Sequence, residues 1–264
     1  MRPSVFGKTL RDQRFAVIGG GAGIIALSFY LCYVYPFIGK AKEMVELFEK
    51  MPPFLRKFID PSVLASPEGF FNLQPFSILG PLVFVGYAIA RGSDLVAGEE
   101  ERGTLELILA GPLSRARVLL QKAAATALVL AYLSAVVWAG MASGCAVFSI
   151  AIDRRRLLEA AASLLLLSLA ALAMTLAAGC LTGRKRASIA AVSGVMVVAY
   201  LIQAYAPMVA SLRPWQKFSP FFYYNGNSVL IHGLQASHAA VLGALAGIFL
   251  GLSVAFFNHR DLRA

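Results

Sequence analysis

The stretch AAASLLLLSLAALAMTLAAGCLTG, residues 160–183, contains no Asp, Glu, Lys or Arg. A helix of about 20 apolar residues crosses the roughly 30 Å hydrocarbon core of a bilayer. Four more uncharged windows of similar length lie at residues 15–39, 69–90, 123–152 and 187–212. The sequence therefore contains at least five segments that are able to cross a membrane.

A further window, residues 218–259, is uncharged over 42 residues, about twice the length that one crossing needs. Asn225-Gly226-Asn227 supplies residues typical of turns. We therefore expect an aromatic re-entrant segment on the outer side, followed by a last span. The six predicted spans lie at about 15–35, 70–96, 117–150, 160–182, 187–207 and 239–257.

Composition supports a membrane protein. Of the 264 residues, 58% are hydrophobic and 14% are charged, whereas soluble domains have roughly 45–50% apolar residues. The prediction is an all-α, polytopic membrane protein whose residues 1–264 form a single domain. The formal charge of +10 is ascribed to basic loops that attract anionic lipid headgroups, and no nucleic-acid partner is expected.

The distribution of basic residues predicts the orientation. With the amino terminus in the cytoplasm, the inner flanks and loops hold 14 Lys and Arg and the outer ones hold 10. This excess favours cytoplasmic termini. The first span has no small-residue cleavage site and is longer than a signal-peptide core, so we expect it to remain as an anchor.

Residues 36–68 form an outer segment between the first two spans. Apolar residues recur in it at helical spacing opposite Lys and Glu, and Pro52-Pro53 ends the pattern. This predicts an amphipathic helix along the outer surface. Such a helix either caps the bundle or contacts a substrate.

Several kinds of chemistry are missing from the sequence. The spans carry no Asp, Glu, Lys or Arg between their ends, so a proton- or sodium-coupled carrier would lack its usual groups. There is no His-Glu-x-x-His motif, no serine–histidine arrangement and no Walker A sequence. We therefore predict no catalytic residue, no metal site and no cofactor in this chain.

The remaining polar and sulfur-containing residues of the spans fit structural roles. Arg91 and Asp94, at the inner end of the second span, have the i,i+3 spacing of a helical ion pair. Cys32, Cys145 and Cys180 occur singly in three spans and are expected to be small buried hydrophobic residues rather than metal or redox groups.

Residues 99–114, EEERGTLELILAGPLS, connect the second and third spans, and we call them the elbow. Gly103 offers a flexible entry and Thr104 a helix cap, and an apolar run continues from there to Gly111-Pro112. Ser114 is placed to cap the helix of the third span. The pattern predicts a short cytoplasmic surface helix, which is either an interfacial anchor or a contact site for a partner.

Several motifs resemble those of the type-2 ATP-binding-cassette exporter permeases. The elbow and the third span contribute Glu99, Gly103-Thr104-Leu105, Leu107-Ile108, Pro112-Leu113-Ser114-Arg115 and Lys122. The basic segment Lys8–Arg14, Ser219-Pro220-Phe221 and the closing residues 256–261 also resemble family features. Gln121 stands where the family usually has Gly before the Lys.

The resemblance implies a six-span permease of the cytoplasmic membrane. Two copies, expected to form a homodimer, would associate with two separate ATPase subunits, and those subunits would bind the ATP and Mg²⁺. The elbow would be the coupling helix, with Glu99–Glu101 facing basic groups of the ATPase. The expected coupling residues are Glu99, Glu100, Glu101, Gly103, Thr104, Leu105, Leu107, Ile108, Pro112, Ser114 and Arg115.

Two alternatives remain open at this stage. The first is a mechanotransmission permease that acts on an extracytoplasmic partner, as in the maturation of nitrous-oxide reductase. The second is a stand-alone membrane-embedded enzyme. For an exporter, the uncharged spans favour an apolar or amphipathic cargo.

Overall fold

A computed structural model describes residues 5–39, 66–105 and 114–259. All regular elements in these ranges are helical. They are α1 (Val5–Asp12), η1 (Ala16–Gly20), α2 (Gly21–Gly39), α6 (Pro67–Phe71), η2 (Asn72–Leu79), α7 (Gly80–Ser93), η3 (Asp94–Gly98), α8 (Glu99–Glu101), α10 (Arg115–Val147), α11 (Arg154–Thr182), α12 (Lys185–Tyr205), η4 (Ala210–Phe218), α13 (Pro220–Asn225), α14 (Val229–His232) and α15 (Ala236–His259).

Six helices of the described ranges are long and apolar enough to cross a membrane, which confirms the predicted number. They cover Ala16–Phe37, Pro67–Glu101, Arg115–Val147, Arg154–Thr182, Lys185–Tyr205 and Ala236–His259. The second differs most from its prediction of 70–96, because α6, η2, α7, η3 and α8 join into one helix of 35 residues. The third span was predicted to end at residue 150 but ends at Val147, and Ser149 just after it takes a left-handed φ of 54°.

The second span is irregular in two places. Pro75 lies inside η2, where the helix is π-helical, and proline lacks the N–H that an α-helical turn needs. The second π-helical stretch, η3, lies just before the elbow. Single π-helical turns within α-helices often occur at functional sites.

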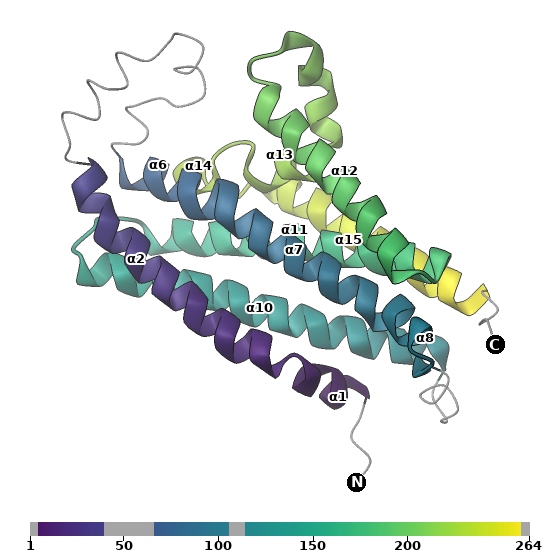
Figure 1. Cartoon of the computed structure of the whole chain (residues 1–264). Coiled ribbons are helices and arrows are strands. Elements are labelled where there is room, and N and C mark those ends of the chain that lie inside the picture. The colour runs from purple at the N-terminus through teal and green to yellow at the C-terminus, as the bar shows by residue number, and fades with distance from the viewer. Residues whose placement is uncertain (1–4, 40–65, 106–113, 260–264) are drawn as a thin grey trace.

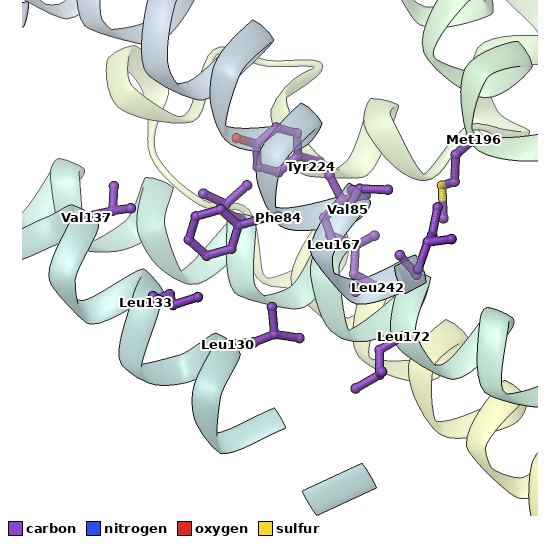
Figure 2. Packing of buried hydrophobic residues seen from close by; sticks show 14 of the residues in the cluster. Phe84, Val85, Leu130, Leu133, Val137, Leu167, Leu172, Met196, Tyr224 and Leu242 are labelled. Atoms are coloured by element: carbon purple, nitrogen blue, oxygen red, sulfur yellow. The ribbon is translucent and has the colours of Figure 1, made fainter. Parts of the chain in front are cut away.

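Helix α11 forms the centre of the bundle. In its most apolar window 67% of residues are buried, against 22% in α12 and 17% in α15. It packs against α7, α10, α12 and α15. Figure 2 shows the resulting core, in which Phe84 and Val85 of α7, Leu130 of α10 and Leu167 of α11 lie close together. The other spans expose many apolar side chains, among them Leu82 and Val197.

Helices α2 and α10 approach closely at two glycines of α10. A Cβ at Gly140 would lie 2.9 Å from the Ser28 hydroxyl oxygen, and one at Gly144 would lie 2.8 Å from the Cys32 sulfur. The Cys32 and Cys145 sulfurs are 3.7 Å apart in a thiol contact. Both of these cysteines, and Cys180, are buried, as expected from the sequence.

The aromatic segment before the last span folds back against the bundle. Tyr224 of α13 is buried, and its hydroxyl donates to the Phe76 carbonyl at 2.5 Å. Its own carbonyl accepts from the Ser163 hydroxyl at 2.7 Å. Trp215 and Phe218 of η4, by contrast, are 57% and 82% exposed. The re-entrant segment is thus held between the second and fourth spans.

Different short helices lie at the two ends of the bundle. Helices α1 and α8 and the last turns of α15 lie at one end, and α6 and α14 lie at the other (Figure 1). Of the predicted outer amphipathic segment, residues 40–65 are outside the described residues. Its described ends belong to helices: α2 continues to Gly39, and Ser66 caps α6 by accepting from the Gly69 N–H at 3.1 Å.

Candidate functional site

The second-span helix runs into the elbow and ends there in a tight turn. Gly103 takes a left-handed φ of 66°, which favours glycine. Its N–H donates to the Glu100 carbonyl at 2.9 Å, and the Thr104 N–H donates to the Glu99 carbonyl at 3.0 Å. The Thr104 hydroxyl donates to the same carbonyl at 3.2 Å. These bonds satisfy carbonyls that a helix end leaves open.

This turn divides the predicted coupling helix, residues 99–114. Glu99–Glu101 form α8, the last turn of the second-span helix, and Gly103 lies in the turn after it. The Thr104 hydroxyl bonds to the Glu99 carbonyl of the helix before it; the N–H groups that Thr104 was expected to cap belong to residues 106–113, outside the described ranges. The chain turns at residues 102–104 because Gly103 accepts the left-handed backbone there.

Only part of the elbow lies in the described residues. Leu105 is 1% exposed. Leu107, Ile108 and Pro112 fall within residues 106–113, outside the described ranges. At the exit, the Ser114 hydroxyl accepts from the Arg117 N–H at 3.4 Å, so the prediction that Ser114 caps the third-span helix is confirmed.

The exit of the elbow also contacts the last span. The Arg115 guanidinium donates from Nη1 to the Phe257 carbonyl at 3.5 Å. The beginning of α10 therefore lies beside the end of α15, and the elbow starts and ends against long membrane helices.

A buried ion pair joins the second and third spans beside the elbow. Lys122 of α10 has a side chain that is only 2% exposed, and its ammonium pairs with the Glu99 carboxylate, whose side chain is 18% exposed. The same ammonium donates to the Leu95 carbonyl at 2.8 Å. A buried lysine is costly unless it is paired and hydrogen-bonded. Both residues were expected to belong to one motif, but their contact was not predicted.

Asp94 is the centre of a second group of charges. Its Oδ1 lies 2.8 Å from Nη1 of Arg102 and 2.7 Å from Nζ of Lys185. The predicted Arg91–Asp94 pair is wrong, since the Arg91 guanidinium instead lies over the Tyr87 ring, 5.7 Å from its centroid. The hydrogen bond to Asp94 raises the pKa of Arg102 above its ordinary value.

Glu101 extends this group to the fifth span. Its Oε1 accepts from the backbone N–H of Lys185 at 2.8 Å. Lys185 is the first residue of α12, where helical N–H groups have no partner within the helix. The end of the second span thus contacts the beginning of the fifth through two carboxylates.

Gln13 connects three elements and was missed in the sequence. Its side chain is 2% exposed. Its Nε2 donates to the Thr126 hydroxyl at 3.0 Å, and its Oε1 accepts from the Tyr87 hydroxyl at 2.6 Å. The only sequence signal is an amide side chain between Asp12 and Arg14 at the border of an apolar span.

An apolar groove of about 290 Å³ separates α7 from α12. Its walls include Ile78, Val85 and Ile89 on one side and Met196 and Tyr200 on the other. The groove has the character of a site for an apolar or amphipathic molecule.

In the described ranges 5–39, 66–105 and 114–259, the side chains that could bind a metal ion are not grouped into a site. No group of three His, Cys, Asp or Glu side chains is placed there to hold a metal ion.

Comparison with known proteins identifies the family. The chain matches the family described as "ABC-2 family transporter protein" over residues 10–262. No curated protein matches the chain. The match spans nearly the whole chain and agrees with the six apolar helices. The chain belongs to the ABC-2 transporter family and is a membrane permease component of an ABC transporter.

Proposed function

We propose that this chain is the permease of an exporter that is driven by a separate ATPase subunit bound at the elbow. In this proposal two permease copies form a homodimer in the cytoplasmic membrane with their termini in the cytoplasm. Two ATPase subunits bind the ATP and Mg²⁺. This chain contributes no catalytic group and supplies the path along which the cargo moves.

The observation that carries the proposal is the Glu99–Lys122 ion pair. This ion pair attaches the start of the elbow to the third span, and the continuous backbone attaches the same residues to the second span. A displacement of the elbow therefore moves both helices together. Separate ATPase subunits that approach each other on binding ATP would thus produce a rigid-body switch.

The proposal gives the elbow residues different tasks. Leu107 and Ile108 provide the apolar contact with a groove on the ATPase. Glu99 and Glu101 hold the elbow against the permease's own helices, as their bonds to Lys122 and Lys185 suggest.

The groove between α7 and α12 supports an apolar or amphipathic cargo. It has an apolar lining on two spans, and a small hydrophilic ion would need polar groups along its path. The second span that forms one wall is the span that continues into the elbow.

The proposal is tested by a variant that should uncouple cargo transport from ATP hydrolysis. The permease and its ATPase are reconstituted in liposomes, and cargo movement and ATP hydrolysis are measured for the wild type and for Gly103→Pro/Leu107→Asp. We expect hydrolysis without transport, or loss of the ATPase from the complex. Val209→Asp, at the opposite end of the bundle, is the matched control. Wild-type transport per ATP in the elbow variant contradicts the proposal.

A further inference from the structure

The fifth-span helix α12 is attached to the second span at its first residue. The Lys185 ammonium lies 2.7 Å from Asp94, and the Lys185 N–H donates to Glu101 at 2.8 Å. Only Gly183 and Arg184 separate α12 from α11, and Gly183 has a left-handed φ of 62°. The start of α12 is therefore held both by a short turn and by two carboxylates of the second-span helix.

The packing around Asp94 depends on a residue without a side chain. A Cβ at Gly98 would overlap the Asp94 carboxylate and would lie 3.3 Å from the Lys185 side chain. Asp94 also pairs with Arg102, which is in the turn that leads into the elbow. One carboxylate thus contacts the second span, the elbow and the fifth span.

The two helices beyond this contact differ in how firmly they are held. In α12, 22% of the most apolar window is buried, against 67% in α11. A shift of α12 therefore disturbs fewer packed side chains than a shift of α11. Because α12 forms one wall of the apolar groove, such a shift also changes the width of that groove.

We infer that Asp94 and Glu101 form a second transmission path, which carries movement of the elbow to the fifth span through Lys185. This inference rests on the proposed function. It adds α12 to the second and third spans as a helix that the elbow moves directly. Lys185 is a positioning residue, since it acts through Asp94 and Glu101 and contacts neither cargo nor nucleotide.

The experiment uses the complete permease–ATPase complex with spin labels at Leu82→Cys and Val197→Cys. Both positions line the groove, and their side chains are 72% and 57% exposed, so labels can be attached there. The native cysteines are buried and serve as the unlabelled background. The distance between the labels is measured without nucleotide and with trapped ATP, after dilution with unlabelled permease.

In the wild-type background we expect the distance to change with nucleotide. Lys185→Met should reduce this change and lower the cargo moved per ATP roughly fivefold, the lower end of typical coupling between sites. Lys185→Arg should restore both. Arg186→Met removes the same charge from an exposed neighbouring position and should leave both unchanged. If Lys185→Met does not fold, Glu101→Ala removes the bond to the α12 N–H instead.

The outcomes separate the two proposals. If Lys185→Met and Glu101→Ala retain the wild-type distance change and transport per ATP, the second path is overturned while the exporter proposal stands. If the wild-type chain binds no ATPase, or shows no nucleotide-dependent transport, the proposed function is overturned and the path with it.

Discussion

Removing the two partners of the Glu99–Lys122 pair should have unequal effects on stability. Glu99→Gln leaves an ammonium that is 2% exposed and still donates to the Leu95 carbonyl, but has lost its counter-charge. Breaking a buried pair in this way costs about 3–5 kcal/mol. Lys122→Met leaves a carboxylate whose side chain is 18% exposed and can turn to water, so we expect a loss of about 1–2 kcal/mol.

The double variant Glu99→Gln/Lys122→Met tests whether the two single effects on stability are additive. It replaces the pair by an amide and an apolar chain of similar length, which is often close to neutral. Its destabilisation should be smaller than the sum of the two single effects by about 2 kcal/mol.

The three buried cysteines provide the assay. Cys32, Cys145 and Cys180 are 0–3% exposed, so a thiol-reactive fluorescent maleimide reports unfolding in detergent during heating. At about 2–4 °C per kcal/mol, the loss of about 3–5 kcal/mol for Glu99→Gln should lower Tm by about 6–20 °C. Arg11→Met, at an exposed cation near the same end, is the control and should change Tm little. A larger loss for Lys122→Met than for Glu99→Gln, or strictly additive effects, would show that the buried ammonium does not depend on Glu99.

Two further substitutions test neighbouring contacts with the same thermal assay. Gly98→Ala places a Cβ against the Asp94 carboxylate and should destabilise by about 1–3 kcal/mol; an unchanged Tm would show that Asp94 moves freely. Gln13→Leu removes the acceptor of the Tyr87 hydroxyl and the donor to Thr126, with an expected loss of about 1–3 kcal/mol; a Tm at or above the wild-type value would contradict the role given to Gln13.

The six spans could be predicted because one physical constraint dominates. The thickness of the hydrocarbon core sets the length of an uncharged helix, and each uncharged window of the sequence became such a helix. The helix cap at Ser114 could also be predicted from the sequence, because a capping hydroxyl bonds to a backbone N–H within three residues of its own position.

The charged contacts at the elbow could not be predicted from spacing. Arg91 and Asp94 have the spacing of a helical pair, but Asp94 bonds to Arg102 and to Lys185, which is 91 residues away. The i,i+3 rule describes one isolated helix and does not include neighbours that the bundle brings close. The same reason explains why the second span continues to Glu101: Glu99 is held there by Lys122, 23 residues further along the chain.

Gln13 shows the same limit at longer range. Its hydrogen bond to Thr126 joins residues 113 positions apart. In the sequence, it is one polar residue beside an apolar window, and its partners Tyr87 and Thr126 follow only from how the first, second and third spans pack.

Contact between the elbow and a nucleotide-hydrolysing partner can be detected by a crosslink from residue 107. A photoreactive amino acid replaces Leu107 in cells that contain the whole transporter, and the same replacement at Val209, at the opposite end of the bundle, is the control. We predict a covalent adduct between position 107 and an ATPase subunit, with no such adduct from position 209. Adducts of position 107 with lipid alone, or equal yields from both positions, would contradict it.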